Sequence, residues 1–244
     1  MTTSLALRFD DALFVFDAGT GLARLGREPF RRLIPPGDRP IHLFLTHLHL
    51  DHTVGLTFLP ALWSNPTVVH VPAHDGAGAE AGPEAFRTVF GGPFFPLGFD
   101  DLLPDISLET VGPGETRVEG VRISARQQDH PGGSLGYRVE DALALITDAA
   151  RDSGAAEFAN NVRVLLHEAW IGEPAGPDAE SAGLNGHSSA EDAALVAKEA
   201  EVGELLLCHL PPADEDRYAG MLARARTIFP RTEICFDGLT RRID

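Results

Sequence analysis

The most constraining feature of this chain is a group of metal-binding side chains directly after an apolar run. Residues 41–45 read Ile-His-Leu-Phe-Leu, and residues 46–52 read Thr-His-Leu-His-Leu-Asp-His. Imidazole nitrogens and carboxylate oxygens are the ligands that zinc and similar divalent cations take. One metal needs three or four converging groups, so four from one short segment suggest a segment that serves two metals, with further ligands elsewhere. The plain alternative is a histidine-rich, solvated loop.

Composition and charge limit the setting and the partners. The chain has 244 residues, 43% of them hydrophobic and 23% charged, as in ordinary soluble globular proteins. It shows neither an apolar run of membrane-spanning length nor the pattern of a signal peptide, so we expect a cytoplasmic protein with no membrane partner. The net charge of −16 predicts that a polyanion such as a large RNA is repelled by the average surface.

The two cysteines, Cys208 and Cys235, are not expected to contribute to a metal site. Each lies in an apolar, strand-like run, and they lack the close spacing of paired zinc ligands. Buried free thiols are therefore expected rather than a disulfide.

Hydrophobic patterning predicts an α/β (α+β) protein with mixed sheets. Strand-like runs cover residues 4–9, 12–16, 41–46, 67–71, 106–111, 121–127, 136–139, 142–147, 162–167, 204–209 and 232–236, and helical spacing covers 22–33, 54–63, 153–160, 189–201 and 214–227. Residues 72–105, rich in Gly, Pro and Phe, predict an irregular excursion with a short helix. It could be a lid, a substrate wall, an oligomer contact or a loop packed on the core.

Four further polar residues lie next to predicted strands or helices, where ligands are expected. His130, Asp148 and His209 end predicted strands, and His187 precedes a predicted helix. Taken alone, each is more often a satisfied polar residue at the end of a strand than a ligand. Together with the segment at 46–52, their order along the chain becomes informative.

In that order the chain resembles the metallo-β-lactamase superfamily, and most of all the branch of ribonuclease Z and the phosphoribosyl cyclic phosphodiesterases. The resemblance covers nearly the whole chain. It rests on the Asp-Ala-Gly-Thr-Gly turn at 17–21, the Thr-His-Leu-His-Leu-Asp-His segment, the His-Pro-Gly segment at 130–132, Thr147-Asp148, the Gly-His-Ser-Ser segment at 186–189 and His209-Leu210-Pro211-Pro212. The Gly-His-Ser-Ser segment favours the phosphodiesterase branch over the β-lactamases.

The resemblance implies a fold and a metal site. The fold would be an αββα sandwich, two mixed sheets flanked by helices, formed by a single domain over residues 1–244. The implied ligands are His47, His49 and His130 for one metal, Asp51, His52 and His209 for the other, and Asp148 as a bridge. The cofactors would be two divalent ions, zinc first, with manganese or iron as alternatives.

The resemblance also implies catalytic roles. His187 would protonate the leaving oxygen or stabilise the charged transition state, since imidazole titrates near neutral pH. Asp51 would hydrogen-bond the attacking hydroxide as well as bind metal, and Glu168 could orient a catalytic histidine. The plainer alternative for His187 is that it caps the following helix and shapes its loop.

Departures from the family narrow the substrate. Ribonuclease Z commonly carries a long tRNA-clamping arm between the positions of His130 and Asp148, but only 17 residues separate them here. A short N-terminal part could leave one sheet edge for a partner subunit, so a homodimer is a further expectation. The two cysteines do not supply the additional structural zinc site of some phosphoribosyl phosphodiesterases.

The leading hypothesis is a dinuclear-metal phosphodiesterase for a small or cyclic phosphodiester. Arg126 or Arg138 could bind phosphate, with structural pairing equally expected. A lactonase or thioesterase would use the same ligands on carbonyl carbon. An iron-dependent redox enzyme and a non-enzymatic, metal-stabilised scaffold are the remaining alternatives.

Overall fold

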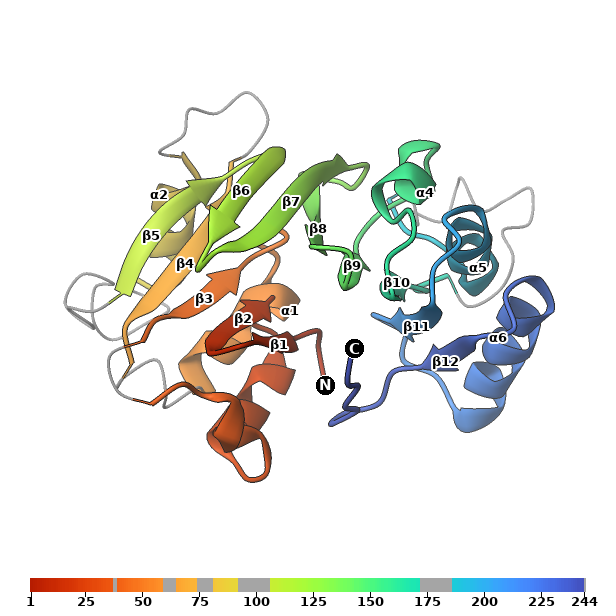
Figure 1. Cartoon of the computed structure of the whole chain (residues 1–244), viewed down its shortest axis with the longest axis horizontal. Coiled ribbons are helices and arrows are strands. Elements are labelled where there is room, and N and C mark those ends of the chain that lie inside the picture. Colours follow the sequence, from red (N-terminus) through yellow and green to blue (C-terminus); the bar gives the residue numbers. More distant parts are fainter. Residues whose placement is uncertain (37–38, 59–64, 74–80, 92–105, 172–185, 244) are drawn as a thin grey trace. The chain divides into compact units, whose positions relative to one another are not determined.

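The computed structural model describes residues 1–36, 39–58, 65–73, 81–91, 106–171 and 186–243. Two compact units divide the chain, a first unit Met1–Gly112 and a second unit Pro113–Asp244 (Figure 1). The expectation of a single domain over 1–244 stays a prediction. Within the described ranges, no helix is long and apolar enough to cross a membrane.

The first unit contains a five-stranded mixed sheet. Its strands are β1 (Leu5–Phe9), β2 (Ala12–Phe16), β3 (Ile41–Phe44), β4 (Thr67–Pro72) and β5 (Ile106–Val111), in the order β1-β2-β3-β4-β5. The β1–β2 pair is antiparallel, and the other three pairs are parallel. Parallel pairing of β2 with β3 puts their carboxyl ends at the same edge of the sheet, where the Asp-Ala-Gly turn and the histidine segment begin.

Short helices cover one face of this sheet. They are η1 (Thr20–Gly26), η2 (Phe30–Leu33), α1 (Leu50–Thr53), η3 (Val54–Phe58) and α2 (Ala81–Val89). Leu22 and Leu25 of η1 and Phe86 of α2 pack in one buried cluster with Leu43 of β3. The cluster holds the β3 strand and therefore the base of the histidine segment. The short helix expected within 72–105 is confirmed as α2, and residues 74–80 and 92–105 lie outside the described ranges.

Two helix predictions in the first unit were wrong in kind. The stretch 22–33 forms two separate 3₁₀ helices, because Gly26 disfavours helix and Pro29 removes a backbone donor. The helix expected at 54–63 begins earlier, at Leu50, and continues from Val54 as 3₁₀ turns to Phe58. Residues 59–64 lie outside the described ranges.

The second unit contains a seven-stranded mixed sheet. Its strands are β6 (Gly114–Val118), β7 (Val121–Gln128), β8 (Ser134–Val139), β9 (Leu143–Ile146), β10 (Val164–Glu168), β11 (Glu204–Cys208) and β12 (Thr232–Ile234), in the order β12-β11-β10-β9-β8-β7-β6. The strands from β9 to β12 pair in parallel, and β6 to β9 pair antiparallel. The carboxyl ends of β9, β10 and β11 therefore share one edge.

One strand of this sheet, β6, was missed from the sequence. It is polar and mostly exposed, so it lacks the apolar alternation that marks a half-buried strand. A two-residue turn with positive φ at Glu119 (51°) and Gly120 (81°) joins it to β7. That conformation is the one that suits a tight hairpin.

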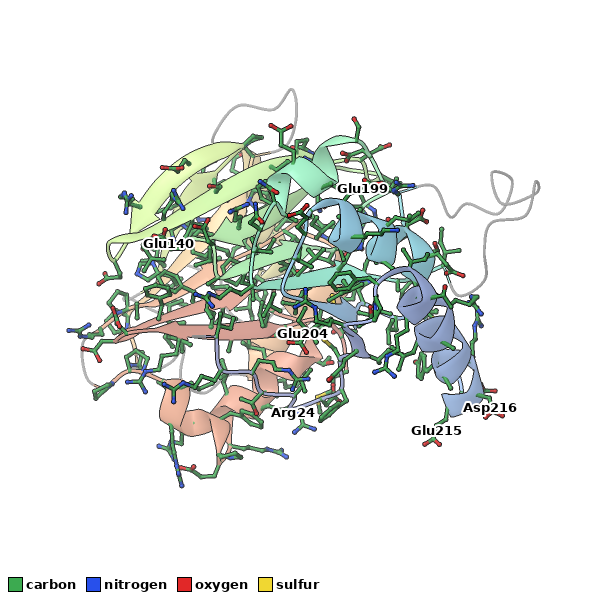
Figure 2. All side chains as sticks on the ribbon, turned by 45° about the vertical axis from the view of Figure 1, so that its right-hand side comes forward. Arg24, Glu140, Glu199, Glu204, Glu215 and Asp216 are labelled. Carbon is green, nitrogen blue, oxygen red and sulfur yellow. The ribbon has the colours of Figure 1, made fainter. Side chains whose placement is uncertain are left out.

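Helices of the described part of the second unit pack on its sheet, namely α4 (Gly154–Phe158), α5 (Ala190–Glu199) and α6 (Glu215–Ile228) (Figure 1). Ser189 caps α5 in a reciprocal arrangement with Asp192. Much of the charge lies on outward positions of these helices. Figure 2 shows Glu199 near the end of α5, and Glu215 and Asp216 at the start of α6, pointing away from the ribbon.

Candidate metal centre

The histidine segment of the first unit is built around one buried aspartate, Asp17. Asp17 directly follows β2 and adopts a left-handed conformation with φ of 58°, while its backbone N–H donates to the Phe44 carbonyl at 2.9 Å. The backbone N–H of Thr46 donates to Asp17 Oδ1 at 2.8 Å, and the Thr46 hydroxyl donates to the same carboxylate at 3.0 Å. The ends of β2 and β3 are thus joined through a single carboxylate.

The same carboxylate orients two of the predicted ligands. His52 Nδ1 lies 2.8 Å from Asp17 Oδ2, and His47 Nδ1 lies 3.0 Å from the Thr46 hydroxyl that donates to Asp17. Since a carboxylate only accepts and this hydroxyl proton is already donated, both Nδ1 atoms carry the proton. The Nε2 lone pair of each ring then remains as the ligand atom, the arrangement that second-shell carboxylates impose on metal-binding histidines.

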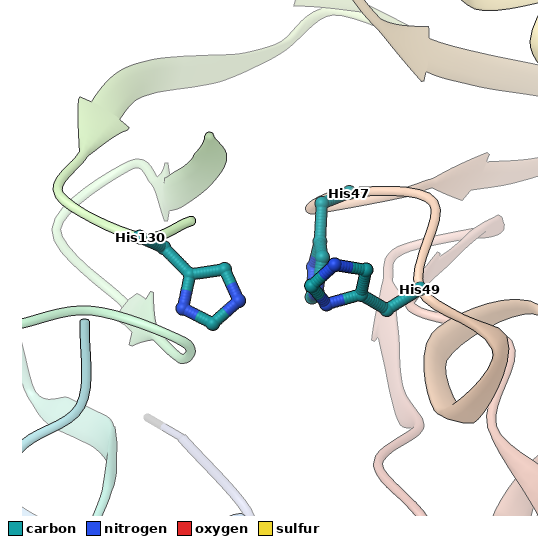
Figure 3. Close-up of side chains that lie close together, drawn as sticks. All are labelled: His47, His49 and His130. Carbon is teal, nitrogen blue, oxygen red and sulfur yellow. The ribbon is translucent and has the colours of Figure 1, made fainter. Parts of the chain in front are cut away.

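The remaining donors of the segment meet these rings directly. His47 Nε2 and His49 Nδ1 lie 2.8 Å apart, and Figure 3 shows both rings on the loop after β3. Asp51 Oδ2 lies 3.2 Å from His52 Nε2. A shared proton or a shared cation satisfies such a pair of ring nitrogens, so the donor set of the first unit fits a divalent cation. His47 and His52 are buried, His49 is exposed and Asp51 is half-exposed.

Close backbone approach locks the helix of the segment to the Asp17 turn. The Ala18 N–H donates to the His52 carbonyl and the Gly55 N–H donates to the Ala18 carbonyl, both at 2.7 Å. A Cβ on Gly55 would lie 1.8 Å from the Gly19 carbonyl oxygen, so only glycine fits there. The turn and the segment are therefore one packed substructure.

His130 of the second unit follows β7 and is oriented by a backbone carbonyl. Its Nδ1 donates to the Gly186 carbonyl at 3.0 Å, so Nε2 is again the ligand atom, and that atom lies 3.8 Å from Asp148 Oδ1. Figure 3 shows the ring on the loop beyond β7. Gly186 has a φ of 96°, and a Cβ there would lie 2.4 Å from Pro131 Cδ. The Gly-His-Ser-Ser segment can approach His130 because it begins with glycine.

Asp148 and His209 end β9 and β11. Asp148 Oδ2 lies 3.5 Å from His209 Nε2 and accepts from the Thr147 hydroxyl at 2.8 Å. Both residues are left-handed, with φ of 53° and 44°. The ligand atoms of His130, Asp148 and His187 lie within 4.8 Å of one another, as do those of Glu168, His187 and His209. The second unit therefore gathers its polar strand ends into one cluster of possible metal ligands.

His187 is held by a buried carboxylate rather than by helix capping. Its Nδ1 donates to Glu168 Oε2 at 2.9 Å, and Glu168 Oε1 accepts from the Ala149 N–H at 2.5 Å. Glu168 is fully buried, whereas 16% of the His187 side chain is exposed. Because Ser189 caps α5, the capping alternative for His187 is wrong. The contact expected between Glu168 and a histidine is present.

Sequence reasoning missed an aromatic side chain in this cluster. The Trp170 ring stacks on His187, with centroids 5.7 Å apart and planes at 30°, and lies 5.0 Å from the His209 ring. Trp170 comes two residues after Glu168, and its position beyond the end of β10 was the signal that could have found it. The role of Asp17 was missed as well, although the residue ends an apolar strand.

Other polar residues prove to be structural. Arg126 pairs with Asp152, and Arg138 donates to the carbonyls of Phe158 and Asn160, so the paired reading of both arginines holds. The neighbouring His167 is completely buried, which lowers its pKa, and its Nδ1 donates to the Glu168 carbonyl at 2.9 Å. Desolvation also raises the pKa of the Cys235 thiol to about 12. Both cysteines are free, as expected, but only Cys208 is fully buried and Cys235 is half-buried.

The sequence decides the family. Residues 13–210 match the family described as the Beta-lactamase superfamily domain. The chain belongs to that superfamily. Ribonuclease BN of Escherichia coli (strain 536) is 27% identical to it, over 92% of this chain and 87% of that protein. The resemblance stated from the sequence motifs is confirmed, and the superfamily is one of metal-dependent hydrolases.

Solved structures confirm the fold. The metallo-β-lactamase fold protein YhfI from Bacillus subtilis aligns with a TM-score of 0.72 and 20% identity, over 98% of this chain and 90% of that one. Human tRNase Z, short form, aligns with a TM-score of 0.65 and 19% identity, over 100% and 93%. A diphosphatase from the PhnP family gives 0.69 and 16%, over 100% and 85%. The predicted metallo-β-lactamase fold, two mixed sheets with flanking helices, is therefore correct.

Proposed function

We propose that this protein is a dinuclear-metal phosphodiesterase for a small or cyclic phosphodiester. In this proposal, donors from both units serve one pair of divalent cations. His47, His49 and His130 would hold the first cation, Asp51, His52 and His209 would hold the second, and Asp148 would be shared. Zinc suits the nitrogen-rich donor set, with manganese or iron as alternatives.

The observation that carries the proposal is the His187–Glu168 pair. A buried carboxylate holds Nδ1–H of a partly exposed imidazole, and the ligand atoms of Asp148 and His209 lie close to the same ring. An imidazole fixed in this way can hold a proton at Nε2 for a leaving oxygen, which is the part of an acid in ester cleavage.

The chain's residues and the cations would make separate contributions to catalysis. When bound, two divalent cations activate water and stabilise the charge that develops on a phosphoryl oxygen. Asp51 would accept a hydrogen bond from the attacking water and so orient it. His187 would deliver the proton from Nε2 to the leaving oxygen, and Glu168 would stabilise the imidazolium through Nδ1–H. Trp170 would keep water from the face of the His187 ring that it covers.

Two observations favour a small substrate. The segment between His130 and Asp148 consists of β8, β9 and their tight turns, which leaves no room there for an RNA-clamping arm. The net charge of −16 also opposes a long polyanion.

The names ribonuclease BN, tRNase Z and diphosphatase of the PhnP family support phosphate-ester chemistry. A homodimer in the cytoplasm remains part of the proposal, and light scattering of the purified protein tests the dimer.

The test is hydrolysis by the metal-loaded protein and two variants. Zinc- or manganese-loaded enzyme should hydrolyse bis-p-nitrophenyl phosphate or a 2′,3′-cyclic nucleotide. His187→Ala should lower kcat by about 10²–10⁴-fold, the usual contribution of acid catalysis, with unchanged metal content. Glu168→Gln should lower kcat less, and the exposed Glu157→Gln provides a matched control.

Two outcomes would overturn the proposal. One is turnover of lactones or thioesters with none of any phosphodiester, which would make this a carbonyl hydrolase. The other is a fully loaded protein that contains iron alone and turns over no ester. Equal activity of His187→Ala and the Glu157→Gln control would remove the assigned acid.

A further inference from the structure

We propose that Gln128 and Ser134 are positioning residues that fix the conformation of Asp148 and thereby the affinity of the metal centre. The inference deepens the proposed function, because Asp148 is the ligand assigned to both cations. Gln128 ends β7, Ser134 begins β8 and Asp148 follows β9, three neighbouring strands of one sheet. We call Gln128, Ser134 and Thr147 the Asp148 clamp.

The clamp binds the backbone on both sides of the Asp148 N–H. The Gln128 carboxamide donates from Nε2 to the Thr147 carbonyl at 2.7 Å. The Ser134 hydroxyl donates to the Asp148 carbonyl at 2.9 Å, and it accepts from Gln128 Nε2 at 2.8 Å. Two consecutive carbonyl groups are thus held by two side chains that also hold each other.

The same group fixes the carboxylate of Asp148. The Thr147 hydroxyl donates to Asp148 Oδ2 at 2.8 Å, which leaves Oδ1 as the oxygen nearest to His130. Oδ2, which lies 3.5 Å from His209 Nε2, is therefore held from within the clamp, while Oδ1 faces His130. Such hydrogen bonds orient metal-binding carboxylates and tune their affinity.

Asp148 needs this support because its backbone is strained. A φ of 53° at a residue with a Cβ costs free energy, and such conformations persist only where the surroundings enforce them. All four residues of the arrangement are buried, so water cannot replace the clamp's hydrogen bonds. Without the clamp, the carbonyls of Thr147 and Asp148 would lose these two donors and the turn could relax.

The sequence makes room for the clamp at Gly136 of β8. A Cβ at this position would lie 2.6 Å from Gln128 Oε1, so any larger residue would displace the carboxamide. Within the described part of the chain, Gln128 Oε1 itself has no hydrogen-bond partner, although it is buried. The side chain is therefore held in place for its Nε2 donor, at the cost of an unsatisfied acceptor. A residue selected only to fill space would be apolar.

The test measures metal affinity and the Co(II) spectrum in Ser134→Ala, with Ser124→Ala on β7 as the matched control. Zinc affinity comes from competition with a chromophoric chelator, and the visible absorption of the Co(II)-substituted protein reports ligand geometry. Loss of a supporting hydrogen bond commonly weakens metal binding about 10–100-fold. We expect that loss and an altered Co(II) spectrum in Ser134→Ala, recovery in Ser134→Thr, and no change in Ser124→Ala.

A second variant guards against misfolding. Leucine is close in size to glutamine, and its apolar side chain is compatible with burial. The Gln128→Leu variant should therefore fold and still bind metal more weakly. A merely structural clamp would lower the melting temperature of the metal-free protein in both variants and leave zinc affinity and the Co(II) spectrum unchanged, which would overturn the proposal. These readouts need no substrate. Failure of every phosphodiester would therefore count against the proposed function and leave the clamp standing.

Discussion

The two units position their predicted metal donors in different ways. In the first unit, four donors lie within six residues, and one buried carboxylate, Asp17, supports two of them. In the second unit, the donors lie on separate elements, and two of them have supports of their own, Gly186 for His130 and Glu168 for His187. A donor set with one shared support should fail as a whole, whereas a set with separate supports should fail residue by residue.

The largest expected effect is acid sensitivity of the first unit. His70 of β4 is buried, and its Nε2 lies 3.3 Å from Nδ1 of His42 on β3, the strand that carries the histidine segment. Burial, followed by repulsion from His42, lowers the pKa of His70 from 6.5 to about 4. The unfolded chain therefore binds the proton first, and stability present above pH 6.5 is lost as the pH falls towards 4. A shift of this size is worth up to about 3 kcal/mol.

The variant His70→Phe, which can keep the stacking on Phe44, should flatten this dependence. Urea unfolding at several pH values between 7 and 4 measures how the free energy of unfolding depends on pH. Glu109 Oε2, 3.5 Å from His70 Nδ1, is the nearby charge that could offset part of the loss. Equal pH dependence in the variant and the parent protein would show that His70 does not control it.

The next effect tests the shared support directly. Asp17→Ala removes the acceptor of His52 and, through Thr46, the orientation of His47. Zinc affinity should fall by about 10–100-fold, as for other carboxylates behind metal-binding histidines. The exposed Asp11→Ala serves as the control, and isothermal titration of the metal-free proteins measures the difference. A fall no larger than in Asp11→Ala would mean that the segment holds its geometry without Asp17.

The smallest effect should come from the second unit, at Trp170. The ring stacks on His187, which Glu168 also holds, so loss of the indole removes only one of two supports. Stacked aromatic pairs contribute about 0.5–1.5 kcal/mol, so Trp170→Ala should lower kcat by about 2–10-fold. Trp170→Phe should restore most of it. A change in KM alone would instead make Trp170 a substrate contact.

The sequence could predict features that depend on residues close together in the chain. The donors at 47–52 are adjacent, the strands that end in Asp148 and His209 are apolar, and Ser189 has the composition of a cap. Glu168 could be predicted as a support for a histidine, but Asp17 could not, because it reaches His52 only through the parallel pairing of β2 with β3. The polar edge strand β6 and the 3₁₀ turns of η1 and η2 were missed or misread for a related reason. Strand pairing determines β6, and the placement of proline determines the 3₁₀ helices, so the hydrophobic period did not reveal them.

Metal stoichiometry tests directly whether the proposed donors serve two cations with Asp148 shared between them. Purified protein equilibrated with zinc, desalted and assayed by mass spectrometry should contain two ions per chain. Asp148→Ala should retain one or none, while His187→Ala should retain two. A single ion in the parent protein, or two ions in Asp148→Ala, would contradict the account.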